Sequence, residues 1–399
     1  KKILYQLIFS AFLLFSNAYL VKANSDILSQ DSTGKYCINT EQDYYNFIEN
    51  IQNYNNKTVI LCNDIDISDV PEATSSFGGI LNGKGHTITY ASKEAKENIA
   101  VFPFRINDNG IVENINVQID ESYAYNSETD EFQTVFSQCD GIAKGITIKG
   151  NVTCIYDDED ENVSIGAIEG NGTLMDSSIA ITYDLQSEKT IEEIAEDIVE
   201  NDLEFEFCQL GTTYTGITYQ NCIGYGQYSE AIKSLADELE PKIEDDTWGY
   251  LCVSFTRKSF SSTSASATNC YYDKENMPDI KIRSEYIANR DNNKEFPNYA
   301  DFGKTTSEMK NQGTYEGFDF NKKWTISPED NNGYPYYNLQ TEEITLKVQA
   351  STEPKVWSTS VPRDYNRFVD YAKNYHFPYQ VDIIDGEKRI FTMTVIIML

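Results

Sequence analysis

Gly110-Ile-Val-Glu-Asn-Ile-Asn-Val117 and Gly141-Ile-Ala-Lys-Gly-Ile-Thr-Ile148 share one pattern, a glycine-led turn followed by a short apolar strand, 31 residues apart. The pattern begins again at Gly85, Gly172 and Gly216, and a last copy without the glycine spans 265–271. The intervals between these glycines range from 25 to 44 residues. Irregular repeats of short strands predict an all-β parallel solenoid, in which the loops vary while the coils stay constant.

The main alternative is an antiparallel β-sandwich, which needs turn signals about every 8–12 residues and no register between units. The local patterns instead fit the repeat. One strand is expected from Thr58 to Ile67, and a turn at 82–85 should precede a strand from His86 to Tyr90.

Three helices are expected beside the strands. Thr40 opens a capping-box-like sequence, which predicts a short helix near 41–53. Two acidic segments carry apolar side chains at helical spacing, namely Ile191, Ile194, Ile198 and Val199, and then Ile232, Leu235, Leu239 and Ile243. Both are expected to pack against the solenoid, because helices that lie on a membrane surface usually have basic polar faces.

The chain is expected to be exported, and its segments to follow in four parts. Residues 1–23 resemble a signal peptide, since two lysines precede an apolar run that is shorter than the roughly 20 residues a membrane-spanning helix needs. No transmembrane segment is expected beyond it. An N-terminal cap with a short helix should span 24–57, the parallel β-helix 58–340, and a separate small or truncated β-containing module 341–399.

The acidic composition excludes some functions. The chain has 63 acidic and 32 basic side chains, a net charge of −31, which argues against a nucleic-acid partner because phosphate binding needs a basic face. Only His86 and His376 are present, and neither belongs to an H-E-x-x-H sequence, so a zinc peptidase site of that type is excluded.

Eight cysteines suit disulfide bonds in an exported protein: Cys37, Cys62, Cys139, Cys154, Cys208, Cys222, Cys252 and Cys270. Bonds between successive coils, Cys208–Cys252 and Cys222–Cys270, are the preferred expectation, because matched positions in stacked strands lie about 4.8 Å apart. The parallel Cβ vectors of such positions can give poor disulfide dihedrals. Pairing of sequence neighbours (37–62, 139–154, 208–222 and 252–270) and eight reduced, buried thiols remain open as alternatives.

Segments at both ends of the repeat region resemble the GLUG-repeat surface proteins of bacteria. At the start these are Tyr36-Cys-Ile-Asn-Thr40, Leu61-Cys-Asn-Asp-Ile-Asp-Ile67 and 77–88; at the end they are Asn269-Cys-Tyr-Tyr-Asp273, 306–310, 318–324 and 333–336. The middle units depart from the Gly-Leu-Val-Gly consensus. The resemblance implies a right-handed parallel β-helix of the pectin-lyase-like kind, exported and displayed on cell surfaces, often in adhesin-like chains. It implies no catalytic residues.

Two acidic groups are candidate sites. Asp157, Asp158 and Asp160 lie in the densest acidic stretch, where consecutive carboxylates could gather around Ca²⁺, although an EF-hand spacing is lacking and a solvated loop is the alternative. Asp64 and Asp66 share one face of an extended strand, roughly 7 Å apart, as a glycosidase pair could. They alternate with Ile65 and Ile67, which favours a solvent-exposed face.

Asparagines and tyrosines mark further positions. Asn114, Asn221 and Asn269 occupy matching places in the repeat, which predicts a structural ladder of stacked side-chain amides. Residues 330–333 are expected to form a turn. Tyr271, Tyr272, Tyr334, Tyr336 and Tyr337 could stack on sugars, but covering the last hydrophobic layer of the solenoid is the favoured role.

These patterns together favour a secreted or cell-surface β-solenoid that acts as a non-catalytic structural or adhesion module. Its partner would be a host or cell-surface glycan or protein, and no cofactor is expected apart from the candidate Ca²⁺. The alternative is a polysaccharide-active enzyme, a lyase or a glycoside hydrolase, on the same scaffold; the sequence contains no complete catalytic constellation for either.

Overall fold

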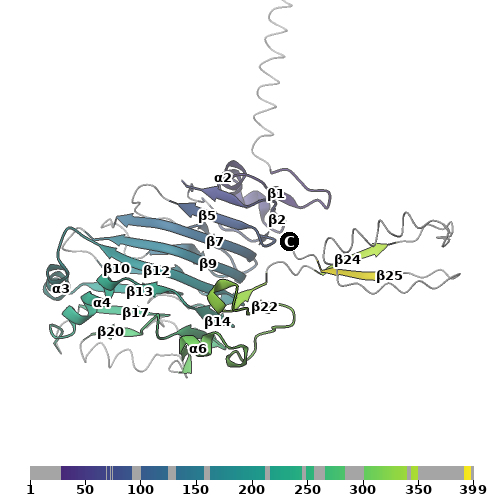
Figure 1. The fold of residues 1–399 in the computed structure, drawn as a ribbon. Coiled ribbons are helices and arrows are strands. Elements are labelled where there is room, and N and C mark those ends of the chain that lie inside the picture. The colour runs from purple at the N-terminus through teal and green to yellow at the C-terminus, as the bar shows by residue number, and fades with distance from the viewer. Residues whose placement is uncertain are drawn as a thin grey trace, which may run out of the picture.

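The computed structural model describes residues 28–338, except 69, 72, 74, 92–99, 125–131, 157–161, 212–215, 245–248, 256–265 and 284–300, together with 343–348 and 391–396. In these parts the protein is mostly β, with strands in parallel sheets and few helices (Figure 1). The segment predicted as a signal peptide lies outside the described residues, and no described helix is both long and apolar enough to cross a membrane.

The larger sheet has 15 strands. Its central order is β1 (Tyr36–Ile38), β2 (Thr58–Leu61), β4 (Ile80–Asn82), β7 (Ile111–Ala124), β9 (Ile142–Ile155), β12 (Ser178–Gln186), β15 (Ile223–Gly224), β19 (Tyr271–Asp273) and β21 (Gly303–Lys304). Beside this path lie β3 (Ile65–Ile67), β5 (Thr87–Ala91), β11 (Thr173–Met175), β14 (Thr218–Gln220), β16 (Gln227–Tyr228) and β18 (Ser266–Thr268).

The smaller sheet has six strands, which the chain visits between strands of the larger one. They are β6 (Phe102–Ile106), β8 (Phe132–Cys139), β10 (Val163–Ile168), β13 (Glu204–Cys208), β17 (Tyr250–Ser254) and β20 (Ile280–Ile282). Only the β17–β20 pairing among them is antiparallel. One continuous apolar core includes inward-facing side chains of both sheets, such as Ile115 and Phe136.

The parallel register repeats every 31 residues in the first half of the larger sheet. Ile80 lies opposite Ile111, Ile111 opposite Ile142, and Ile142 opposite Thr173. The glycine that begins the first unit is therefore Gly79, and the expectation that Gly85 fills this place is wrong. Gly85 instead lies in the turn between β4 and β5.

Glycine is needed just before β7, β9 and β11, because the backbones of successive repeat units are in van der Waals contact there. A Cβ added to Gly110, Gly141 or Gly172 would lie 2.5, 2.3 or 2.2 Å from the carbonyl oxygen of Phe77, Gly110 or Gly141, respectively. No side chain fits at such distances without displacing the backbone. The glycines thus allow the hydrogen bonds by which Ile142 and Thr173 donate to Gly110 and Gly141.

The predicted helices are present. α2 (Glu41–Glu49) and the 3₁₀ turn η1 (Ile51–Tyr54) cover the first strands, and Thr40 caps α2 through Asp43. α3 (Ile191–Glu200) and α4 (Glu230–Leu239) bury their apolar faces and pack against each other (Figure 1). The single strand expected from Thr58 to Ile67 is wrong, because the chain turns a corner at 62–64 between β2 and β3.

The remaining elements follow the last coil. They are α6 (Thr306–Met309), η3 (Gln312–Thr314), β22 (Trp324–Thr325), η4 (Asn331–Gly333) and β23 (Tyr336–Tyr337). Beyond them β24 (Glu343–Val348) and β25 (Phe391–Ile396) pair antiparallel, so the segment expected to contain β structure, 341–399, has two paired strands.

Replacing Gly141 with alanine should lower the free energy of unfolding by at least about 2 kcal/mol, because the new Cβ overpacks a rigid backbone contact. Denaturant unfolding measures the change. Gly313→Ala is the control, since its Cβ would meet only the end of a side chain at 3.3 Å. Equal stability of the two variants would contradict the packing argument.

Candidate functional site

The two acidic candidate sites stand differently. Asp157, Asp158 and Asp160 lie outside the described residues, and no cluster of metal-binding side chains occurs among the residues that are described. Asp64 accepts a hydrogen bond from the Thr87 backbone N–H and lies 3.1 Å from His86 Nδ1, while Asp66 is exposed to solvent. Asp64 therefore joins the corner at 62–64 to the start of β5.

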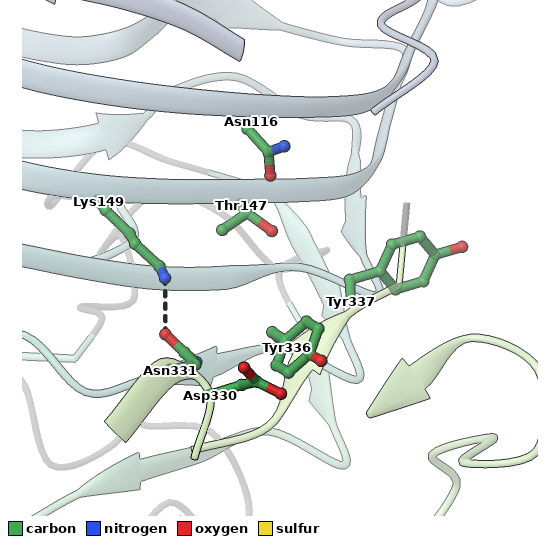
Figure 2. Close-up of a pocket in the computed structure, with 7 residues that line it drawn as sticks. All are labelled: Asn116, Thr147, Lys149, Asp330, Asn331, Tyr336 and Tyr337. Atoms are coloured by element: carbon green, nitrogen blue, oxygen red, sulfur yellow. Dashed lines mark hydrogen bonds between the residues drawn. The ribbon is translucent and has the colours of Figure 1, made fainter. Parts of the chain in front are cut away.

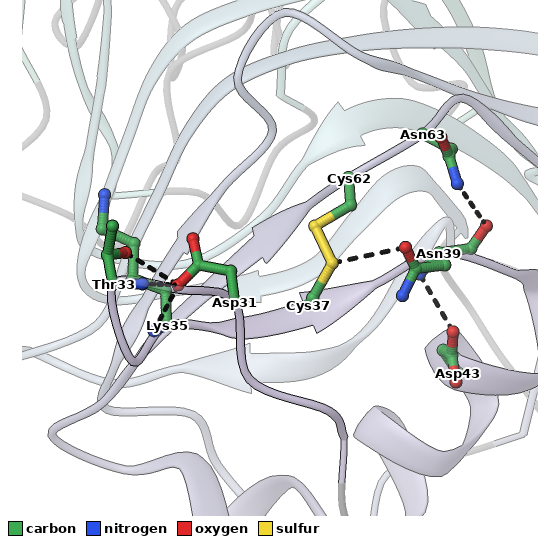
Figure 3. The surroundings of a disulfide bond; sticks show 8 residues. All are labelled: Asp31, Thr33, Lys35, Cys37, Asn39, Asp43, Cys62 and Asn63. Carbon is green, nitrogen blue, oxygen red and sulfur yellow. Dashed lines mark hydrogen bonds between the residues drawn. A yellow bond between two sulfur atoms is a disulfide. The ribbon is translucent and has the colours of Figure 1, made fainter.

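Only the first two cysteines are bonded. The Cys37–Cys62 disulfide links β1 to the residue that follows β2 (Figure 3). The other six cysteines form no disulfide bond and are buried: Cys139, Cys154, Cys208, Cys222, Cys252 and Cys270. The structure therefore differs from the preferred pairing between coils and from three of the four sequence-neighbour pairs.

The register places each of the two expected pairs on neighbouring strands, where no bond forms. Cys208 lies opposite Ser254, and Cys252 lies opposite Glu206, an offset of two residues that the bonded Cys37 and Cys62 share. Cys222 and Cys270 are opposite each other, next to the paired Ile223 and Tyr271. There the parallel Cβ vectors of stacked strands oppose the dihedral angle that a disulfide requires.

The three asparagines expected to form a ladder lie in one column at a corner of the larger sheet. Two other residues lie in the same column, between the first asparagine and the second. Going along the coils, the column runs Asn114, Gly145, Asp176, Asn221 and Asn269, and every member has a positive φ. Asn269 donates to Asn221, which donates to Asp176. Asn114 lies two coils away from this hydrogen-bonded part, so the ladder is interrupted.

Residues 305–338, here called the strap, lie against the outer face of the larger sheet (Figure 1). Its side chains form a second apolar cluster with the sheet residues Ile223, Tyr225 and Tyr271; the strap contributes Met309, Tyr315, Phe318, Phe320, Trp324, Ile326, Tyr334 and Tyr337. The tyrosines expected to cover the last hydrophobic layer thus mostly lie on the outer face of the larger sheet. Tyr272 differs, since it stacks on Phe255 in the main core.

A buried carboxylate anchors the strap to the last coil. Asp273, fully buried, accepts hydrogen bonds from Tyr334 at 2.5 Å, Thr306 at 2.7 Å and Asn276 at 2.9 Å. Two backbone N–H groups donate to its other oxygen. A second anchor is the ion pair between Lys323 and Asp176, 2.7 Å long, which joins the strap to the column at the sheet corner.

A polar pocket of about 290 Å³ lies where the strap meets the outer face of the sheet (Figure 2). The sheet contributes residues of β7 and β9, and the strap contributes residues of η4 and β23 with the residue before η4. The lining consists of Asn116, Thr147, Lys149, Asp330, Asn331, Tyr336 and Tyr337. Its volume is close to the lower end of the range of about 300–1,000 Å³ typical of small-molecule sites.

Lys149 is the one cationic side chain in the pocket lining, as far as the structure describes the chain. It donates to Asn331 Oδ1 at 2.6 Å, and no carboxylate of the described residues forms an ion pair with it. Burial lowers the pKa of its ammonium group, because removal from water disfavours the charged form. Two of its three N–H donors remain available to a ligand.

The turn that bears Asp330 and Asn331 holds an uncommon backbone conformation. Asn331, Asn332 and Gly333 have φ of 50°, 54° and 84°, three left-handed residues in succession. Asparagine tolerates this region better than most residues, yet a run of them costs energy. Asn331 is held by the hydroxyl of Tyr225, which stacks on Tyr334 with ring centroids 4.5 Å apart. These contacts therefore hold the turn, which forms one side of the pocket, in its left-handed conformation.

Of the residues that line this pocket, the sequence indicated only those that belong to the strap. The turn at 330–333 was expected, and Tyr336 and Tyr337 were named as possible sugar-stacking residues. Thr147 and Lys149 gave the weaker signal of polar side chains alternating with Ile146 and Ile148, which predicts only that they face outward. No sequence pattern predicted that these two residues would lie beside the strap, whose residues are nearly 200 positions further along the chain.

Replacing Asp273 with asparagine should loosen the strap. The substitution removes a buried charge that accepts five hydrogen bonds, so unfolding stability should fall by about 2–3 kcal/mol. Trypsin should also cleave faster after Lys310, Lys322 and Lys323, as followed by mass spectrometry. Asp301→Asn, at an exposed residue, is the matched control. Unchanged cleavage would exclude Asp273 as an anchor.

Thiol titration should count six free cysteines in the unfolded, unreduced protein and eight after reduction. In the native protein at pH 8, Cys139 and Cys222 should react slowly, because both are buried and burial raises the pKa of Cys139 to about 12 and that of Cys222 well above its usual value. A count of two or four in the unreduced, unfolded protein would show that disulfides form in addition to Cys37–Cys62.

Comparisons with known proteins give no indication of function, so a function is inferred from the pocket. No family model, curated protein or solved structure matches the chain.

Proposed function

We propose that the protein is a secreted or cell-surface parallel β-helix that serves as a non-catalytic structural and adhesion module and binds a glycan in the pocket beneath the strap. The pocket is the observation that carries the proposal. It combines two tyrosine rings with amide, hydroxyl, ammonium and carboxylate groups, and sugars need both an apolar surface and many hydrogen bonds. A protein partner would call for a broad contact surface, whereas this pocket is a local hollow of about 290 Å³.

Sheet topology supports the β-helix part of the proposal. The chain alternates between two largely parallel sheets, and on each return it joins the larger sheet further along the stack, as β7, β9 and β12 do. A parallel crossover of this kind is right-handed in nearly all proteins. The resemblance of the segments near both ends to GLUG-repeat surface proteins points the same way.

Export is supported by the signal-like residues 1–23 and by the Cys37–Cys62 disulfide, since disulfides persist in oxidising compartments. The six free thiols are compatible with that location because all are buried.

The absence of a carboxylate pair favours binding over hydrolysis. Among the described residues that line the pocket, Asp330 alone is acidic, whereas glycosidases of the usual kind need two acidic residues. One observation favours the alternative of a polysaccharide lyase: Lys149 has a lowered pKa and could serve as a base.

A glycan and mucin array tests the function. The wild-type protein should bind a defined set of glycans, and Tyr336→Ala should lose that binding because it removes a ring that lines the pocket. Tyr45→Ala, on α2 and outside the pocket lining, should retain it. Binding unaffected by Tyr336→Ala would exclude this pocket, and release of reducing or unsaturated ends from a bound glycan would favour the enzyme.

A further inference from the structure

The charges of the pocket point to an uncharged ligand. Lys149 and Asp330 contribute one positive and one negative group, and they form no direct ion pair. A polyanionic glycan would also meet the field of a protein with a net charge of −31, which repels it. A cationic amino sugar would have to lie beside the Lys149 ammonium group. An uncharged sugar avoids both penalties.

The hydrogen-bonding capacity of the two charged side chains is complementary. Lys149 can only donate, and the Asp330 carboxylate can only accept. Within the described part of the chain no group donates a hydrogen bond to that carboxylate, and Asp330 is exposed at the pocket. A hydroxyl group both donates and accepts, so two neighbouring hydroxyls of one sugar ring could satisfy both side chains.

The sheet side of the pocket offers acceptors in fixed positions. Asn116 donates its amide N–H to the Gly85 carbonyl, which orients its Oδ1 atom. The Thr147 hydroxyl, held by Ser178 on the next coil, lies opposite Asn116 in the register. These groups can orient a sugar ring without adding charge.

Two tyrosine rings and the size of the pocket suit a single sugar ring. Tyr337 contacts Gly145 and packs edge-on to Trp324, with ring centroids 5.5 Å apart, so its ring is held in place. Tyr336 lies beside Asp330 in Figure 2, where a sugar could place its carbon face on the ring. The volume of about 290 Å³ suits a single monosaccharide unit.

We propose that the pocket recognises one uncharged sugar unit at the end or branch of a glycan, with two neighbouring hydroxyls bridging the Lys149 ammonium and the Asp330 carboxylate. This assignment rests on the proposed glycan-binding function and specifies its ligand.

Titration calorimetry with simple methyl glycosides tests the assignment. Neutral hexosides with adjacent hydroxyls should include at least one that binds, and removing either hydroxyl of the pair should weaken it at least about tenfold, because a charged group then loses its partner. The matching uronic acid and amino sugar should bind more weakly than the neutral sugar. Lys149→Met and Asp330→Asn should each reduce affinity at least about tenfold.

Lys233→Met, on the exposed face of α4, is the matched control, and thermal unfolding verifies that each variant folds. Stronger binding of the uronic acid or amino sugar would overturn the uncharged assignment while leaving glycan binding intact. Affinity that rises steadily with oligosaccharide length would overturn the single-unit assignment. Failure of every glycan on the array and in calorimetry would instead refute the proposed function itself.

Discussion

The close approach of stacked backbones at the glycine corner is the constraint on which the rest of the structure depends. Gly110, Gly141 and Gly172 place each turn within van der Waals contact of the one before, at distances that no Cβ allows. This contact keeps the 31-residue register of the first coils, so that side chains of the same kind line up across β7 and β9. A shift by one residue would turn every outward side chain inward.

The register also determines what the outer face offers. On the first coils that face carries polar side chains such as Asn116 and Gln118, while on later coils it carries Ile223 and Tyr271. The apolar part is covered by the strap, which buries an aromatic cluster there. The pocket lies at the boundary between the two, where the strap stops covering the sheet and polar groups of both meet.

Several polar contacts hold the strap against the sheet, and they keep the pocket rigid before a ligand binds. The buried Asp273 carboxylate and the Lys323–Asp176 ion pair connect it to the sheet, and Asn331 connects it to Lys149. A site whose walls are held by hydrogen bonds to a rigid sheet loses little conformational freedom when a ligand enters. The left-handed turn at Asn331 and Asn332 costs energy in isolation and is kept in place by these contacts.

Local sequence patterns predicted much of the fold. Apolar spacing and capping residues predicted α2, α3 and α4, since these signals act within a few turns of one helix. The repeat predicted stacked parallel strands. The first glycine was misplaced because Gly85 also fits the pattern, and only the pairing of Ile80 with Ile111 identifies Gly79. The predicted disulfide bonds between matched cysteines were wrong for a similar reason. Matching two positions in a sequence repeat does not show in which direction their side chains point.

The sequence by itself determined the class of fold, the acidic charge, the helices and the turn at 330–333, because each depends on composition or on neighbours along the chain. Only the tertiary structure decided which cysteines pair, where the strap lies, and that Thr147 and Lys149 of β9 face Asp330 and Tyr336. These outcomes depend on contacts between residues far apart in the chain, whose geometry emerges only when the coils stack and the strap packs against them.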